Sequence, residues 1–332
     1  MPLKNLIYYL CNSIGIYKWF CKEYTLLEVN VLLGWLPVSF THILLTLLVV
    51  VIWGVNFIFI KWGLDQFPPL LLCATRFLLS SVPIVFFIRF PAAPVRMIVL
   101  YGLIMFALQF ALFFFGMSVG MTPGMASLIM QLQVFFSMFF AAIFLKEIPF
   151  IWQIIGSIVS FMGIGIIALH ADKNISLMGL ILLVCAAATW GLGNLIVKKI
   201  QHVNMMSLVV WGNFIACIPM LALSAYFEGI NNIIHVYTHL TWISIGSVFY
   251  IAYISTWIGY SAWSWLLSRH PVGEVVPFAL LIPVVGILSS VIILHEPLQL
   301  WKLFAGLLVM GGLGINLLGT RLFIKKTEPQ LG

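Results

Sequence analysis

Ten apolar runs, each long enough to cross a lipid bilayer, follow one another along this chain of 332 residues. A transmembrane helix needs about 20 predominantly apolar residues, and in lipid only helices or closed barrels satisfy their own backbone polar groups. The runs lie at 43–63, 69–89, 97–117, 122–144, 150–170, 176–198, 206–227, 240–262, 272–294 and 300–321. The connections are short, apart from a loop expected at 228–239. The sequence therefore predicts an all-α membrane protein with ten transmembrane helices.

The composition supports this prediction and excludes other classes of protein. Hydrophobic residues make up 63% of the chain and charged residues only 8%, whereas a soluble domain carries about 25% charged residues. An ordinary cytoplasmic enzyme, a nucleic-acid binder and a disordered protein are excluded. The five cysteines are scattered without a C-x-x-C spacing, so neither a disulfide framework nor a metal site is indicated. No cofactor is expected.

The distribution of positive charge predicts the orientation in the membrane. If the first span starts in the cytoplasm, 12 Lys and Arg residues lie on the cytoplasmic side. Lys61, Lys173 and Lys302 lie outside, and Arg76 lies within a span. Because cytoplasmic loops carry the excess of Lys and Arg, both termini are expected in the cytoplasm.

An internal repeat divides the spans into two sets of five. Residues 143–166, shifted by 149 positions, meet 292–315 with matched residues at Glu147/Glu296, Trp152/Trp301, Gly163/Gly312 and Gly165/Gly314. The segment Trp53–Lys61 (WGVNFIFIK) likewise resembles Trp190–Lys198 (WGLGNLIVK). Five is an odd number, so the second set enters the membrane from the opposite face. Two inverted five-helix repeats are an architecture of secondary transporters.

The repeat also predicts the domain organisation. Residues 41–173 form the first repeat and 174–322 the second, followed by a cytoplasmic tail at 323–332. Residues 1–40 stand outside the repeat as an N-terminal extension. Basic and apolar residues gather on opposite faces of a helical wheel drawn for its first part, which indicates an amphipathic helix that lies on the membrane surface. A mis-chosen start codon is the alternative.

Polar side chains within spans are costly in lipid and are therefore candidates for function. Asn56 and Asn194 are expected on facing walls of a central cavity, where an amide suits a zwitterion, or they bond neighbouring helices. Trp53 and Trp190 share a helix face with them and could hold an ammonium group or simply pack.

Arg76 is the charged residue within a span, where it could hold a carboxylate through forked hydrogen bonds or extend towards the membrane surface. Further candidates for the cavity are Gln109, Gln131 and Tyr260. Gln131 and Gln133 are two residues apart and cannot share a helix face, so one could face the cavity while the other bonds a neighbouring helix.

Pro277 and Pro283 lie inside the ninth span, where each removes a backbone hydrogen bond and could form a gate. Glu147 and Glu296 end spans four and nine at opposite membrane faces and are expected to anchor helix ends. Gly163, Gly165, Gly312 and Gly314 are expected to allow close helix contact.

The order of these motifs resembles the EamA family of the drug/metabolite transporter superfamily. The resemblance covers about 41–320 and rests on Trp53-Gly54-Val55-Asn56 with Lys61, on Arg76-Phe77, and on VVPFALLIPVVG before Glu296. The stretch GMASLIMQLQVFFSMFF resembles the bacterial O-acetylserine/cysteine exporter branch. The family resemblance implies a ten-helix transporter of the bacterial inner membrane that exports small metabolites, in particular amino acids of the cysteine pathway.

The rival interpretations are an enzyme, a scaffold and a carrier for another substrate. A membrane enzyme needs convergent acids, a nucleophile with its base, or a metal cluster, and no span contains paired carboxylates. A carrier for other amino acids, nucleotides, sugars or hydrophobic cations remains open. So do proton-linked export, facilitated efflux, and a monomeric or homodimeric state. The expected partners are a small-molecule substrate and the lipid bilayer, with no nucleic acid.

Overall fold

A computed structural model describes residues 40–170, 176–200, 203–270 and 275–319, and these residues form helices joined by short connections. The predicted amphipathic helix before residue 40 and the predicted tail at 323–332 lie outside the described residues. The first half of the chain contains α3 (Phe40–Leu64), α4 (Pro69–Ser81), η1 (Ile84–Phe86), α5 (Val95–Tyr101), η2 (Gly102–Leu108), α6 (Gln109–Ser118), α7 (Pro123–Ile129), η3 (Met130–Leu132), α8 (Gln133–Leu145) and α9 (Ile151–Leu169).

The second half repeats this order. It contains α10 (Leu177–Ile200), α11 (Met205–Leu223), η4 (Ser224–Gly229), α12 (Ile230–Thr238), α13 (Trp242–Phe249), η5 (Tyr250–Gly259), α14 (Tyr260–Arg269), η6 (Val276–Leu280), α16 (Leu281–Leu294), α17 (Leu300–Gly314) and η7 (Ile315–Gly319). Within the described residues, eight helical segments are long and apolar enough to span a membrane, and Phe278–Leu294 and Leu300–Gly314 are shorter apolar helices. The predicted all-α membrane fold is confirmed.

The prediction of a loop at 228–239 is wrong. The helical segment from Met205 extends through η4, and Gly229, with φ of 84°, separates it from a further helix, α12, that ends at Thr238. The seventh apolar run ends at residue 227, but beyond it Ile230, Ile233, Ile234 and Tyr237 recur at helical spacing, which produces an amphipathic helix.

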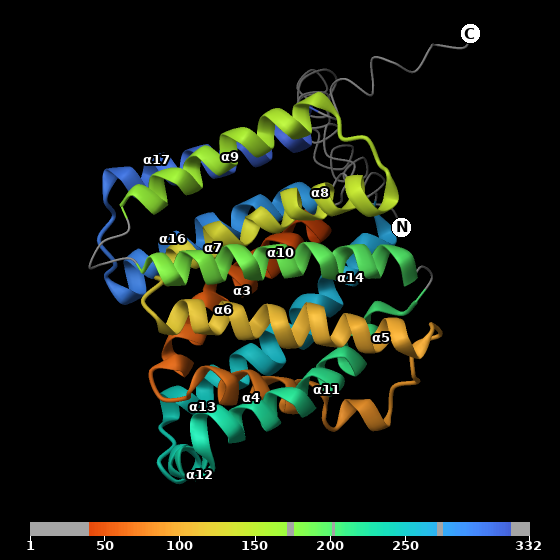
Figure 1. Cartoon of the computed structure of the whole chain (residues 1–332), viewed down its shortest axis with the longest axis vertical. Coiled ribbons are helices and arrows are strands. Elements are labelled where there is room, and N and C mark those ends of the chain that lie inside the picture. Colours follow the sequence, from red (N-terminus) through yellow and green to blue (C-terminus); the bar gives the residue numbers. More distant parts are fainter. Residues whose placement is uncertain (1–39, 171–175, 201–202, 271–274, 320–332) are drawn as a thin grey trace, which may run out of the picture.

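Helices that are far apart in the sequence pack as symmetric pairs. In Figure 1 the spans run across the view side by side, with α9 and α17 paired at the top edge. Helix α3 packs against α16, and its counterpart α10 packs against α8, the counterpart of α16. Helix α4 packs against its own counterpart, α11. Exchange of the two halves maps these helix pairs onto one another or onto themselves, as a two-fold axis in the membrane plane requires.

The alternation of the spans places the connections on two faces of the membrane. We call the face that carries Thr122 and Glu296 the Glu296 face, and the opposite one, with the α8–α9 connection, the Glu147 face. Helices α8 and α16 end in the same way on these opposite faces. Lys146 and His295 adopt left-handed backbone conformations with φ of 57° and 54°. The following amides of Glu147 and Glu296 bond the carbonyls of Ala141 and Ser290, so the two helix ends are capped in the same way.

Small residues bring α9 and α17 into backbone contact. A Cβ atom added at Gly312 would lie 2.3 Å from the carbonyl oxygen of Gly156, and one at Gly163 would lie 2.8 Å from that of Ala305. These two contacts are equivalent under the 149-residue repeat. The hydroxyl of Ser160 also donates to the carbonyl of Val309 at 2.9 Å. Gly163 and Gly312 therefore mediate close helix packing, as predicted.

Gly165 and Gly314 do not take part in this contact, because a Cβ at either position would meet nothing within 4 Å. The expectation that they also allow close packing is wrong. Each lies two positions after the contact glycine, and residues two positions apart lie on different faces of a helix.

The Gly312→Ala substitution is expected to destabilise the protein by about 1–3 kcal/mol, because the added methyl group meets backbone and cannot be accommodated by a rotamer change. Gly314→Ala is the matched control and should be neutral or slightly stabilising, since alanine has the higher helix propensity. Thermal unfolding of both variants in detergent measures the difference. Equal melting temperatures would contradict the assigned α9–α17 contact.

Candidate functional site

A cavity in the middle of the membrane-spanning region is lined by both halves of the chain. It holds about 660 Å³ of space free of protein atoms, with open solvent at its mouth included. The lining residues are Trp53, Asn56, Phe57, Arg76, Gln109, Phe110, Phe113, Met130, Gln131, Trp190, Ser255, Tyr260 and Ile282. None of these described lining residues is acidic.

Arg76 supplies the positive charge of the cavity. Its side chain projects from α4 and only 3% of the residue is exposed. The guanidinium lies 4.2 Å from the ring centre of Phe110, and Nη2 donates to the Thr256 hydroxyl at 3.4 Å. Nη1 is buried without a hydrogen-bond partner among the described residues. A buried cation with an unused donor is costly unless an anion reaches it, so the cavity is suited to a negatively charged group.

Asn56 presents the complementary group. Its Oδ1 atom is buried and has no hydrogen-bond partner in the described part of the chain, and the residue lines the same cavity as Arg76. An amide oxygen accepts hydrogen bonds from an ammonium or hydroxyl group. The cavity thus offers an unused donor and an unused acceptor to a bound molecule.

An aromatic cluster forms a further part of the wall. The indole Nε1 of Trp53 donates to the carbonyl of Ser255 at 3.1 Å, which fixes the orientation of the ring. The rings of Tyr260 and Trp263 lie 5.4 and 5.3 Å from that of Trp53. Aromatic faces attract cations and cover apolar groups.

Irregular helical turns place several lining residues. The π-helical stretches η2 and η5 occupy equivalent spans of the two repeats, and Gln109 and Tyr260 follow them directly. The 3₁₀ turn η3 carries Met130 and Gln131, and η6 is its counterpart in the second repeat. Mid-helix π and 3₁₀ segments often mark functional sites and hinges.

The structure brings seven of the eight candidate cavity residues together: Trp53, Asn56, Arg76, Gln109, Gln131, Trp190 and Tyr260. Asn194 is not among the lining residues. Its amide nitrogen donates to Gln133 Oε1 at 2.8 Å and to Ser137 Oγ at 2.9 Å, which joins α10 to α8. Asn194 thus occupies a helix–helix contact, because the extra Gly193 shifts it by one position relative to Asn56.

The two candidate gating prolines lie where the ninth span changes from a 3₁₀ turn to an α-helix. Pro277 is in η6, and Pro283 is the third residue of α16. A proline in the first turn of a helix removes no intrahelical hydrogen bond. Pro283 therefore costs α16 no hydrogen bond, because it lies in the first turn of this helix.

The apolar part of the lining was not anticipated from the sequence. The cavity is also lined by five apolar residues, Phe57, Phe110, Phe113, Met130 and Ile282. Ser255 is a polar lining residue that was not anticipated either. Phe110 in addition lies against the Arg76 guanidinium. In a chain this rich in apolar residues no sequence signal separates a cavity-lining phenylalanine from a packing one. Among the described residues no group of three or more His, Cys, Asp or Glu could hold a metal ion.

An inverted repeat of membrane-spanning helices around a central cavity with a few polar side chains is the architecture of a membrane transporter. The model of the EamA-like transporter family matches residues 40–169 and 177–318, which are the two structural repeats. The chain belongs to this family, and the family resemblance noted in the sequence is confirmed.

Relatives and a solved structure agree with this assignment. The chain is 39% identical over 284 residues to a "Probable amino-acid metabolite efflux pump" of Salmonella typhimurium, covering 83% of this chain and 95% of the relative. It is 36% identical over 283 residues to a protein of the same name from Escherichia coli, with the same coverage. A crystal structure with 16% identity matches with a TM-score of 0.59 over 85% of this chain and 98% of the other, which supports the fold alone.

Asn56→Ala and Asn194→Ala are expected to affect different properties. Asn194→Ala removes the two interhelical hydrogen bonds and should lower stability by about 1–2 kcal/mol. Asn56→Ala removes an oxygen without a partner and should leave stability within about 0.5 kcal/mol of wild type. Thermal unfolding in detergent gives both values. A larger loss for Asn56→Ala than for Asn194→Ala would contradict the placement of the two amides.

Proposed function

We propose that this membrane transporter exports amino acids and related metabolites by alternating access around the central cavity. The names of the two relatives support export of amino-acid metabolites. The excess of Lys and Arg on the Glu147 face supports a topology in which that face is cytoplasmic and the Glu296 face is periplasmic. The non-acidic lining of the cavity argues against hydrophobic cations as substrates.

The unpaired Arg76 guanidinium is the observation that carries this proposal. A substrate carboxylate bonded to Nη1 neutralises a buried charge that has no ion-pair partner in the described part of the chain. Hydrogen bonds between charged groups are about twice as strong as neutral ones. A carboxylate is therefore the substrate group that gains most on entering the cavity.

The rest of the lining supports an α-amino acid rather than a simple carboxylic acid. The unused Oδ1 of Asn56 can accept from the substrate ammonium group, and Trp53, Trp190 and Tyr260 offer aromatic faces to it. Phe57, Phe113 and Ile282 leave an apolar space for a short side chain. Cysteine and O-acetylserine have side chains of this kind, and we propose them as the first substrates to test.

Transport into everted membrane vesicles tests the proposed substrates. Labelled cysteine or O-acetylserine should accumulate, and their methyl esters should not compete, because an ester cannot form the charge-assisted bond to Arg76. Measurements with and without a pH gradient separate proton-linked transport from facilitated diffusion. Accumulation of neither compound, with accumulation of another amino acid, would contradict the cysteine-pathway specificity.

Arg76→Met is expected to reduce transport by at least tenfold while stability stays equal or rises. The substitution replaces an uncompensated buried charge with an apolar side chain of similar volume, which is often stabilising. Transport in vesicles and thermal unfolding in detergent measure the two effects separately. Arg269→Met is the control, because Arg269 lies at the end of α14 over the ring of Trp265. Wild-type transport by Arg76→Met would contradict the assigned role.

A further inference from the structure

The α7 half of the fourth span is closed against the ninth span. All seven residues of α7, Pro123–Ile129, are buried, and α7 packs against α16. The helices are in close contact at two glycines. A Cβ at Gly286 would lie 2.5 Å from Ser127 Oγ, and one at Gly124 would lie 3.4 Å from the backbone of Ile287. Nothing larger than glycine fits at Gly286 unless these two helices move apart.

The α8 half of the same span is packed differently. Only Phe135 is buried among the 13 residues of α8, and the principal neighbour of this helix is α10. The turn η6, which the repeat relates to η3, lies against α3, α16 and α17. Spans four and nine are thus joined on the Glu296 face, whereas on the Glu147 face their described residues contact other helices. The 3₁₀ turns η3 and η6 mark the level at which this changes.

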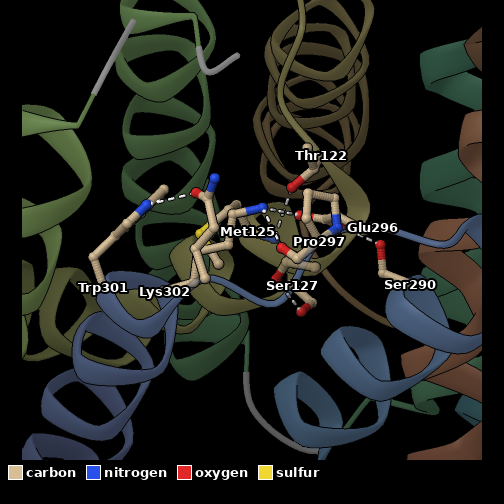
Figure 2. Close-up of polar contacts among 10 residues, drawn as sticks. Thr122, Met125, Ser127, Ser290, Glu296, Pro297, Trp301 and Lys302 are labelled. Atoms are coloured by element: carbon tan, nitrogen blue, oxygen red, sulfur yellow. Dashed lines mark hydrogen bonds and ion pairs between the residues drawn. The ribbon is translucent and has the colours of Figure 1, made fainter.

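A buried ion pair lies where the joined ends meet. Figure 2 shows the Glu296 carboxylate among Thr122, Ser290 and Lys302, which come from the start of α7, from α16 and from α17. Lys302 Nζ donates to Glu296 Oε1 at 2.8 Å and to the Pro297 carbonyl at 3.2 Å. Ser290 and Thr122 also donate to the carboxylate. The side chains of Lys302 and Glu296 are only 8% and 11% exposed.

The carboxylate of this cluster is ionised at neutral pH. Burial by itself raises the pKa of Glu296, but the hydrogen bonds from Lys302, Ser290 and Thr122 outweigh it and lower the pKa below the ordinary value. Thr122 lies at the start of α7, whereas Glu296 lies in the connection that follows α16. The hydrogen bond between them therefore crosses the interface between α7 and α16. Separation of α7 from α16 therefore breaks at least one bond to a buried charge.

The repeat provides a direct comparison for this cluster. Glu147, the counterpart of Glu296, pairs with Lys198, but these side chains are 47% and 55% exposed. Exposed ion pairs contribute little to the stability of a protein, whereas loss of one partner from a buried pair strongly destabilises it. The same glutamate position is thus a weak surface pair on one face and a buried, four-membered cluster on the other.

We propose that Thr122, Ser290, Glu296 and Lys302 form a gate latch, which holds the Glu296 face closed and must open in each transport cycle. The latch acts on the packed pair α7 and α16, and the 3₁₀ turns η3 and η6 allow their ends to separate without unfolding the rest of each span. The proposal rests on the alternating-access part of the proposed function and is independent of the substrate.

Cysteine labelling tests the latch without any substrate. Ser127→Cys in a cysteine-free background serves as the reporter, because Ser127 is buried between α7 and α16. An impermeant maleimide should label it slowly in intact cells, and Glu296→Gln or Lys302→Gln should accelerate labelling at least tenfold. Glu147→Gln and Lys198→Gln are the matched controls and should change the rate less than twofold.

Two further variants keep the test decisive if the single substitutions fold poorly. The exchange Glu296→Lys with Lys302→Glu should restore part of the slow labelling, and the milder Thr122→Val should accelerate labelling without removing a charge. Acceleration only in everted vesicles would support the latch and reverse the proposed topology. Wild-type labelling rates in both preparations for Glu296→Gln and Lys302→Gln, with folding intact, would overturn the proposal.

A disulfide can show whether the gate has to open. A Cβ at Gly124 would lie 3.5 Å from the Cβ of Ser290, a separation suitable for a disulfide. The double variant Gly124→Cys/Ser290→Cys should lose transport under oxidising conditions and regain it on reduction, whereas each single variant should be insensitive to the oxidant. Unchanged transport by the oxidised, cross-linked protein would also overturn the proposal.

Discussion

The need to satisfy polar groups inside an apolar membrane determines most of this structure. Backbone groups bond within helices, and hydroxyl side chains bond backwards along the same helix, as Ser81 does to Phe77 and Ser137 to Gln133. Four buried side-chain atoms in the described residues lack a partner, and two of them, Arg76 Nη1 and Asn56 Oδ1, belong to residues of one cavity. Where so much else is paired, these two atoms indicate a site completed by a ligand.

Apolar run length and the 149-residue repeat predicted most of the fold. Both are properties of single residues or of fixed spacings, which a sequence displays directly. The exceptions depend on context. The segment 228–239 looked polar, yet Glu228 accepts the backbone amides of Leu70 and Leu71 at the start of α4. These hydrogen bonds join residues that are more than 150 positions apart, so the local sequence around Glu228 could not reveal them.

The candidate site was predictable to the extent that it is polar. Every polar group within a span stands out against 63% apolar residues, and most of those selected lie together at the cavity. The failure at Asn194 has a local cause, since one position along a helix turns a side chain by about 100°. That rotation points its amide at Gln133 and Ser137 instead of the cavity. The phenylalanines that line the cavity could not be predicted, because nothing in the sequence distinguishes them from phenylalanines that pack between helices.

The repeat is symmetric in its backbone and asymmetric in its charges, and this difference has mechanical consequences. Lys302 is the repeat counterpart of Gln153, and Lys198 is that of Lys61, so the two equivalent glutamates pair with lysines from unrelated positions. A symmetric backbone lets either face close in the same way. Unequal ion pairs make the two closed states differ in free energy, because a buried pair and an exposed pair respond differently to being separated. The sequence contains both lysines, but only the packing of α7 against α16 and α17 determines which one is buried.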